Sequence, residues 1–185
     1  MDTMKSPSEV VPKVLLVLFT LCILLGSFWA CYMPTNTGFN KASQSKISSL
    51  PDFSLKTPEG AIVNSQDYAH KILLVDFWAT WCPPCVEEIP HLNNLYSAFQ
   101  SRGIEFLGIS MDSGNPEIVR KFILQHGVKY PVVMGNSSVG KDFGGIRGLP
   151  TTFILDQQGT IIKRYDGYRP AYIKDMRKTI EQLLG

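Results

Sequence analysis

The sequence lacks a surplus of charge of either sign. Its 185 residues include 18 Lys and Arg against 16 Asp and Glu, which leaves a formal net charge of +2. A protein that binds nucleic acid mainly through its charge carries a clear basic excess, and an acidic tail needs a run of carboxylates. Neither pattern is present, so we expect no nucleic-acid partner.

Histidine and cysteine are also scarce, with three and four residues respectively. Cys22 and Cys31 fall within one apolar run, whereas Cys82 and Cys85 form a C-x-x-C pair. A structural zinc site needs four ligands, and one such pair supplies only half of them. The histidines are scattered along the chain, at His70, His91 and His126. We therefore expect no metal.

One long apolar run lies near the N-terminus. Residues 14–33 contain no charged side chain, and twenty helical residues span ~30 Å, the thickness of a bilayer core. Phe28 and Trp29 occupy positions where a signal peptidase requires small side chains. The run therefore predicts a transmembrane anchor or signal, and we favour an uncleaved single-pass helix with residues 1–13 in the cytoplasm. A cleaved signal and lipidation of Cys31 are the alternatives.

The rest of the chain divides into a linker and one domain. Residues 34–49 are rich in Asn, Ser, Thr, Gly and Lys, which is typical of a linker. Residues 50–185 have the length of a single domain and contain no internal repeat.

Apolar patterns within this domain alternate between strand and helix. Continuous apolar runs predict buried strands, and apolar residues spaced by three and four predict helices. The expected order is strand, helix, strand, helix, strand, hairpin and helix, at 72–79, 83–102, 104–111, 115–126, 130–134, 152–165 and 171–184. This alternation predicts an α/β domain with a central mixed β-sheet and helices on both faces.

The second of these helices has two candidate capping residues, Ser113 and Asn115, and Gly127 fits its C-terminal end. We expect Ile118 and Phe122 to face the core, together with Ile123.

Cys82 and Cys85 lie where a predicted buried strand leads into a predicted helix. A sulfur at a helix N-terminus faces the positive end of the helix dipole, which favours the reactive thiolate. Two cysteines at this spacing can bridge, so that one attacks a partner's disulfide and the other resolves the mixed disulfide. We expect Cys82 to be the nucleophile and Cys85 the resolving cysteine. A purely structural disulfide is the alternative, although it would close a very short loop.

The two residues between the cysteines are Pro83 and Pro84. Neither has a backbone N–H, so neither can donate a hydrogen bond to the sulfur of Cys82. Stabilisation of the thiolate then rests on the N–H of Cys85 and on the helix dipole. We therefore expect the pKa of Cys82 to be lowered less than in a strongly oxidising site.

Residues 75–85 resemble the active-site segment of thioredoxins. Pro90 matches the helix-kinking proline of that family, and residues 148–153 resemble its cis-proline loop. These features occur in the family's order, and the resemblance covers residues 51–185. The apolar N-terminal run and the long stretch at 104–140 resemble the TlpA/ResA-like branch, which includes membrane-anchored proteins with an AhpC/TSA-Redoxin-like domain.

This resemblance implies a thioredoxin fold and thiol–disulfide oxidoreductase activity, with the Cys82–Cys85 disulfide in place of any cofactor. It implies a cis peptide bond before Pro150, which would face the cysteines. Leu149 would then offer backbone groups to an incoming peptide. We expect Trp81 to lie exposed beside the cysteines and to form an apolar docking surface with Pro83 and Leu149.

Two acidic residues are candidates for the acid–base step. Asp76 interrupts an apolar strand, where burial penalises the ionised form, so its pKa should be raised and it can take the proton of Cys85. This position matches the buried acid of thioredoxins. Many TlpA/ResA-like proteins instead carry an acid three residues after the second cysteine, which here is Glu88. We favour Asp76; for Glu88 the alternative is a solvated acid in the first helical turn.

The expected function is that of an extracytoplasmic oxidoreductase on the periplasmic side of a bacterial cytoplasmic membrane. Its partners would be protein disulfides or dithiols. The family favours a reductant that receives its electrons from a membrane electron donor. Its targets would be proteins such as apocytochrome c during cytochrome maturation. The alternatives are an oxidant or isomerase of secreted proteins, a non-catalytic binding module and a thiol peroxidase. The peroxidase signature P-x-x-x-[ST]-x-x-C is not met, because Val75 and Ala79 precede Cys82 at its fixed positions.

Overall fold

The structure is a computed structural model that describes residues 48–185. The predicted anchor at 14–33, the tail at 1–13 and the linker up to residue 47 lie outside the described residues. Within 48–185, no helix is both long and apolar enough to cross a membrane.

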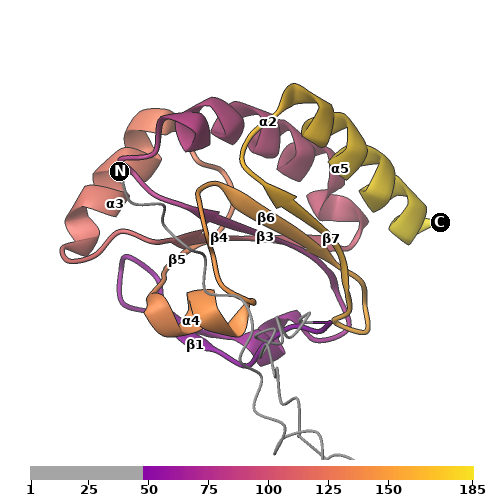
Figure 1. Ribbon diagram of the computed structural model, residues 1–185, viewed down its shortest axis with the longest axis horizontal. Coiled ribbons are helices and arrows are strands. Elements are labelled where there is room, and N and C mark those ends of the chain that lie inside the picture. Colours follow the sequence, from indigo (N-terminus) through magenta and orange to yellow (C-terminus); the bar gives the residue numbers. More distant parts are fainter. Residues whose placement is uncertain (1–47) are drawn as a thin grey trace, which may run out of the picture. The chain divides into compact units, whose positions relative to one another are not determined.

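The centre of the domain is a seven-stranded mixed sheet with the strand order β2-β1-β5-β4-β3-β6-β7 (Figure 1). The strands are β1 (Ser54–Lys56), β2 (Ile62–Asn64), β3 (Ile72–Trp78), β4 (Ile104–Ser110), β5 (Val132–Met134), β6 (Thr151–Leu155) and β7 (Ile161–Asp166). β3 pairs in parallel with β4 and antiparallel with β6. Every residue of β3 is buried, which confirms the prediction of a strand covered on both faces.

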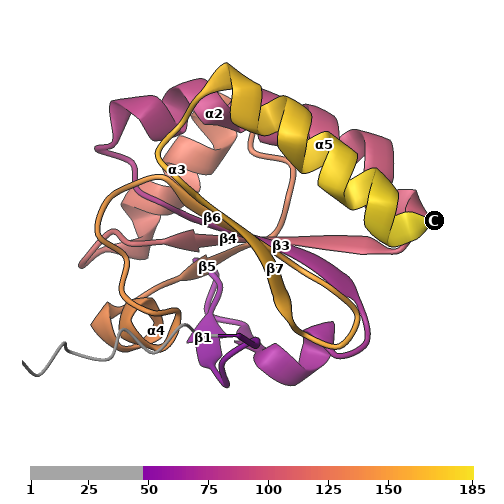
Figure 2. The same ribbon diagram turned by 45° about the vertical axis from the view of Figure 1, so that its right-hand side comes forward.

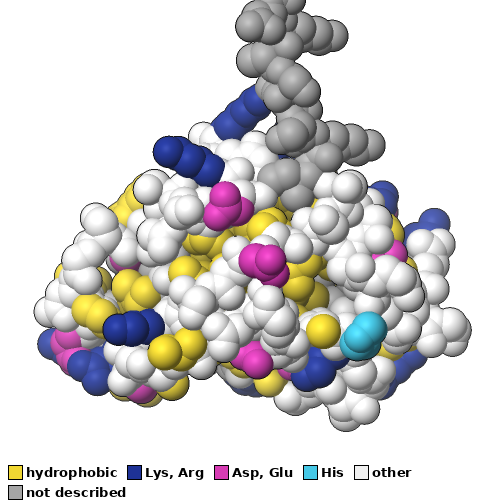
Figure 3. All heavy atoms as spheres, turned by 90° about the horizontal axis from the view of Figure 1, so that it is seen from below, with side chains coloured by type: hydrophobic (Ala, Val, Ile, Leu, Met, Phe, Trp, Pro, Cys, Tyr) yellow, Lys and Arg dark blue, Asp and Glu magenta, His cyan; other side chains and the backbone are white. Residues whose placement is uncertain are grey.

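Helices cover both faces of the sheet, as the alternating pattern predicts. The longer helices α2 (Pro83–Phe99), α3 (Pro116–His126) and α5 (Pro170–Leu184) lie together on one face, and the short α4 (Ser137–Asp142) lies on the other (Figure 1, Figure 2). Two 3₁₀ helices complete the elements, η1 (Ser65–Tyr68) and η2 (Gln100–Arg102). On the α4 side, hydrophobic side chains gather in the middle of the surface (Figure 3).

Alternate residues of β3 face opposite layers, because successive side chains of a strand point to opposite faces. Leu74 and Trp78 pack in the core under α2, whereas Val75 and Phe77 pack in the core on the α4 side. Asp76 is two residues from both Leu74 and Trp78, so it lies on the same face of β3, and its side chain points toward α2.

The start of the described chain is held at one end of the sheet. The carbonyl of Ser48 accepts a hydrogen bond from the N–H of Ile161, and the N–H of Leu50 donates to the carbonyl of Gly159. Gly159 lies in the turn between β6 and β7. This turn follows Leu155, whereas Thr151 at the other end of β6 pairs with Phe77 near the end of β3.

Helix α3 differs from its prediction in one respect. Asn115 is the N-cap, since its side chain accepts a hydrogen bond from the N–H of Glu117, and Gly127 ends the helix at a φ of 60°. Phe122 is buried as expected. The expectation for Ile118 is wrong, because 56% of Ile118 is exposed and the adjacent Val119 is fully buried instead.

Candidate active site

The cysteine pair lies where β3 leads into α2. Cys82 is the N-cap residue of α2, and Cys85 lies in its first turn. Their sulfurs form a disulfide, with the two Cα atoms 5.3 Å apart. Both residues are nearly buried, at 4% exposed for Cys82 and 1% for Cys85, so Cys82 is the more accessible of the two. A partner can reach this disulfide only by docking against the surface around it.

The first turn of α2 differs in detail from the expected arrangement. Pro83 and Pro84 occupy its first positions, as the sequence predicts. The N–H of Cys85, which we expected to support the sulfur, donates instead to the carbonyl of Cys82 at 3.1 Å, and the N–H of Val86 donates to the same carbonyl at 3.3 Å. In this oxidised form the N–H of Cys85 is therefore bonded to a carbonyl, while the Cys82 sulfur still lies at the positive end of the α2 dipole.

Asp112 anchors the loop that precedes the cysteines. Its carboxyl group accepts hydrogen bonds from the backbone N–H of Thr80 at 2.9 Å and from the Thr80 hydroxyl at 2.5 Å. It also accepts one from the hydroxyl of Ser110 at 2.8 Å. The loop after β4 is thereby tied to the loop after β3, two residues ahead of Cys82. Sequence reasoning missed Asp112.

The peptide bond between Leu149 and Pro150 is cis, as the resemblance to thioredoxins implies. The carbonyl of Pro150 accepts a hydrogen bond from the N–H of Gly167 at 2.8 Å, and the hydroxyl of Thr151 donates to the carbonyl of Gly148 at 2.8 Å. Arg164 donates to the carbonyl of Gly145 at 3.1 Å. These bonds fix the loop that faces the disulfide.

A groove of about 480 Å³ lies between this loop and the disulfide. The predicted docking residues Trp81, Pro83 and Leu149 all line it, and 67% of Trp81 is exposed. Pro150 is buried and lies outside the groove lining. The lining also includes Gly148 of the predicted cis-proline loop and three residues that sequence reasoning did not single out, namely Met111, Ile146 and Arg147. Among residues 48–185, Arg147 is the only charged residue of the lining.

Both candidate acids are buried, with 2% of Asp76 and 1% of Glu88 exposed. Glu88 is therefore not a solvated acid of the first helical turn. Burial raises the pKa of Asp76, and a hydrogen bond from the Thr152 hydroxyl partly offsets this effect. Burial also raises the pKa of Glu88, and the nearby charge of Asp76 raises it further. The two carboxyl groups thus influence each other, and a group that holds a proton at neutral pH can exchange it with a thiol.

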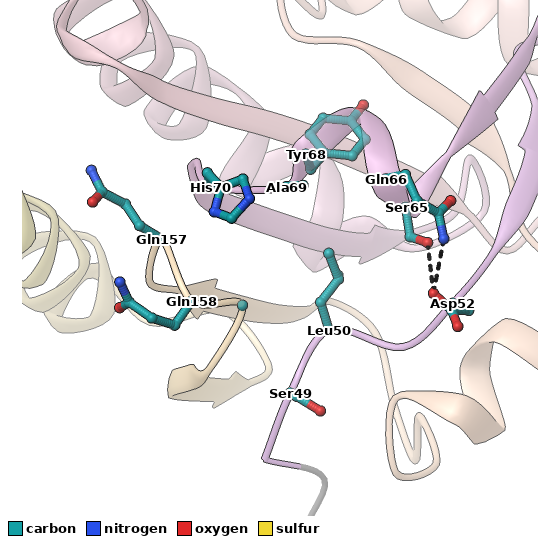
Figure 4. A pocket seen from close by; sticks show the side chains of 11 residues that line it. Ser49, Leu50, Asp52, Ser65, Gln66, Tyr68, Ala69, His70, Gln157 and Gln158 are labelled. Atoms are coloured by element: carbon teal, nitrogen blue, oxygen red, sulfur yellow. Dashed lines mark hydrogen bonds between the residues drawn. The ribbon is translucent and has the colours of Figure 1, made fainter.

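Within residues 48–185, no group of three or more His, Cys, Asp or Glu side chains is placed to hold a metal ion. A second pocket, of about 450 Å³, lies at the end of the sheet where the described chain begins (Figure 4). Gln157 and Gln158 lie across from His70 in it, and Asp52 accepts hydrogen bonds from Ser65 and Gln66. None of the expected site residues lines this pocket.

Comparison with known proteins agrees with this geometry. The AhpC/TSA family pattern matches residues 48–164. The thiol-disulfide oxidoreductase ResA of Geobacillus thermodenitrificans is 32% identical over 165 residues, which are 89% of this chain and 91% of that protein. ResA of Bacillus subtilis is 34% identical over 128 residues, or 69% and 70% of the two chains.

Solved structures show the same fold. A thioredoxin-family thiol:disulfide interchange protein from Chlorobium tepidum superposes with a TM-score of 0.66 at 32% identity, and the match covers 75% of this chain and 97% of that one. One assignment follows from the buried cysteine pair at the start of α2, the cis-proline loop and these relatives. The chain belongs to the AhpC/TSA family, has the thioredoxin fold and is a thiol–disulfide oxidoreductase related to ResA.

Proposed function

We propose that the protein is a membrane-anchored reductant of selected protein disulfides on the periplasmic side of a bacterial cytoplasmic membrane. The observation that carries the catalytic part is the near-buried Cys82–Cys85 disulfide, with a largely apolar groove in front of it and with the buried Glu88 one helical turn after Cys85 on α2. The anchor is inferred from the uncharged run at 14–33.

The substrate binds in the groove beside Cys82. Leu149 offers its backbone groups to an extended peptide, while Trp81 and Pro83 pack against the apolar side chains that flank the substrate's disulfide. Pro150, which follows Leu149 through a cis bond, belongs to the same binding loop.

The exchange then proceeds in two steps. The Cys82 thiolate attacks the substrate disulfide, so that one Cys82–substrate bond forms and one substrate sulfur leaves as a thiolate. Cys85 next gives its proton to the carboxyl pair Asp76 and Glu88 and attacks Cys82, which forms the intramolecular disulfide and releases the second substrate thiolate. Both substrate thiolates take protons from solvent.

Two features favour reduction over oxidation. The prolines at the start of α2 have no N–H, and the N–H of Cys85 is bonded to a carbonyl, so little stabilises a Cys82 thiolate apart from the dipole. A strongly oxidising site needs a very stable thiolate. We infer that a membrane electron donor reduces the Cys82–Cys85 disulfide and that apocytochrome c is a substrate.

The reduction potential tests this proposal. The full chain is equilibrated with glutathione buffers, and the fraction of reduced Cys82–Cys85 is measured. We expect a value well below about −200 mV; a value near about −120 mV, that of a strong oxidant, would overturn the direction. Cys82→Ser should abolish reduction of a disulfide peptide of apocytochrome c, and Cys85→Ser should trap a mixed disulfide with it. Absence of both effects would exclude the proposed catalysis.

A further inference from the structure

The loop that faces the disulfide is rich in glycine and is buried at both of its ends. This groove loop, residues 143–150, connects α4 to β6 (Figure 2). Phe143 at its start and Pro150 at its end are buried. Three of its eight residues are glycine, which has the largest conformational freedom to lose on folding. Its middle therefore needs support from other parts of the domain, because four of its residues line the groove, namely Ile146, Arg147, Gly148 and Leu149.

The first residues of the groove loop are held by aromatic packing and by the end of α4. The ring centroid of Phe143 lies 5.0 Å from that of Phe77 and 5.2 Å from that of Phe153. Gly144 and Gly145 follow with φ angles of 84° and 83°, which glycine adopts at little cost. Their N–H groups donate to carbonyls of α4 at 2.8 and 3.0 Å. The chain thus turns sharply out of α4 just before the residues that line the groove.

Arg164 of β7 reaches the groove loop from the neighbouring strand. It pairs with Phe153 of β6, and its guanidinium carbon lies 5.2 Å from the centroid of the Phe153 ring. Nε and Nη2 of Arg164 donate to the carboxylate of Asp166 at 3.0 and 2.9 Å. Nη2 also donates to the carbonyl of Gly145 at 3.1 Å. The ring and the carboxylate fix the guanidinium, and the guanidinium in turn fixes the carbonyl of Gly145.

This arrangement uses properties that only arginine has. The planar guanidinium presents its N–H groups as a rigid fork, so it can donate to a carboxylate and to a carbonyl while it stacks on an aromatic ring. A lysine would bring a single nitrogen on a flexible stem to the same place. The carboxylate of Asp166 offsets the positive charge of Arg164, and Arg164 is not part of the groove lining. Any influence of Arg164 on a substrate therefore passes through the position of the groove loop.

We propose that Arg164 is a positioning residue for substrate binding, which holds the groove loop through Gly145 in the shape that receives a peptide beside Cys82. The inference deepens the proposed function and rests on it for the identity of the substrate. A loop that is ordered before the peptide arrives has less conformational entropy to lose on binding, so it binds the peptide more tightly. Arg164 should thus affect how well a peptide binds and not how fast the sulfurs exchange.

Arg164→Ala in the full chain separates these two effects. The reduced protein is assayed with a short peptide that has one internal disulfide and no charged side chain. We expect the apparent KM to rise roughly three- to tenfold, the usual effect of one lost hydrogen bond, while kcat stays the same. The rate at which dithiothreitol reduces the Cys82–Cys85 disulfide should also stay the same, because so small a dithiol does not need the groove loop.

Two further variants show whether the contact with Gly145 is the cause. Arg164→Lys keeps the charge but not the fork, so it should also raise KM. Lys163→Ala is the matched control, because the adjacent Lys163 forms an exposed ion pair of 3.3 Å with Asp175 of α5, and its loss should leave KM unchanged. An unchanged KM in either Arg164 variant, an equal rise in Lys163→Ala or a slower reaction with dithiothreitol would overturn the proposal.

Binding without chemistry separates this inference from the proposed function. The same peptide with both cysteines replaced by serine is titrated into the oxidised full chain, and Arg164→Ala should raise its Kd by the same factor as KM. If the wild-type chain reduces no disulfide peptide but Arg164→Ala still weakens binding of the serine peptide, only the proposed function fails. If the wild-type chain reduces the peptide and neither KM nor Kd changes in the Arg164 variants, only the role of Arg164 is wrong.

Discussion

The hydroxyl of Thr152 donates a hydrogen bond of 3.1 Å to the carboxyl group of Asp76. The two residues are direct partners in the pairing of β3 with β6, so the sheet itself fixes their contact. Burial raises the pKa of Asp76, and this hydrogen bond lowers it by a smaller amount. The balance keeps a carboxyl group that is buried in an apolar strand able to ionise near neutral pH.

Replacing Thr152 by Val should therefore raise the pKa of Asp76 further. We expect the pH midpoint of thiol–disulfide exchange to move upward and the free energy of unfolding to fall by about 1 kcal/mol, the usual effect of one lost hydrogen bond. Stopped-flow exchange across a pH series measures the first effect, and chemical denaturation measures the second. Thr151→Val is the control, because Thr151 is equally buried on β6 but bonds to Gly148. An unshifted midpoint in Thr152→Val would contradict the prediction.

The raised pKa values of Asp76 and Glu88 predict how stability depends on pH. Above about pH 4 both carboxyl groups ionise in the unfolded chain, whereas the folded chain still holds protons on them. The folded state binds more protons, so the free energy of unfolding falls as the pH rises through neutrality. Denaturation at several pH values should show this slope.

Asp76→Asn and Glu88→Gln should each flatten that slope. Glu87→Gln is the matched control, because Glu87 is the exposed neighbour of Glu88 on the same helical turn. If all three variants keep the wild-type slope of stability against pH, the prediction is wrong. The same variants assign the acid–base role, since the one that slows the resolving step identifies the proton acceptor of Cys85.

Asp112→Ala should loosen the loop that carries the cysteines. The change removes the acceptor of three hydrogen bonds, two from Thr80 and one from Ser110. We expect a loss of about 1–3 kcal/mol in the free energy of unfolding, because partly buried donors lose their acceptor. The rate of exchange should also fall. Asp112→Asn keeps one acceptor oxygen and should show a smaller loss; equal stability of all three proteins would refute this role.

Arg147 should influence which peptides exchange fastest. It is the only charged residue among the described part of the chain that lines the groove, so an acidic side chain beside the substrate cysteine gains a favourable interaction. We expect acidic peptides to react roughly two- to fivefold faster than matched Lys peptides at low salt, because exposed ion pairs are weak, and this preference should shrink at high salt. Arg147→Glu should reverse the order. Arg102→Glu, at an exposed arginine on η2, should leave it unchanged.

The sequence predicts best the helices and strands that have a long apolar run or a clear spacing of apolar residues. β3 is an apolar run broken only by Asp76, and its predicted bounds are right within one residue. α2 begins at Pro83 as predicted, but it ends at Phe99, and the last three residues of the predicted helix form η2 instead. β1 (Ser54–Lys56) has one buried residue between two exposed ones, and three residues are too few for a period to show. The short α4 (Ser137–Asp142) is hard to predict for the same reason, because it is too short for a spacing of apolar residues to show.

The residues of the candidate site also divide into those that the sequence predicts and those that it does not. Cys82 and Cys85 stand out because their spacing at a strand–helix junction is visible in the sequence. Asp112 does not, because its role depends on a contact with Thr80, 32 residues earlier in the chain. The burial of Glu88 is equally invisible, since an acid near a helix N-terminus is normally solvated and only the packing of α2 on the sheet places its side chain inside.

The hydrogen bonds that tie Ser48 and Leu50 to the turn after β6 have a practical consequence. That turn lies at the opposite end of β6 from Pro150, and so at the opposite end of the sheet from the cysteines. Whatever precedes Ser48 is joined to the domain at this remote end. A support attached to the domain at Ser48 would thus be joined at the end remote from the cysteines, so the groove in front of the disulfide would stay open to a partner.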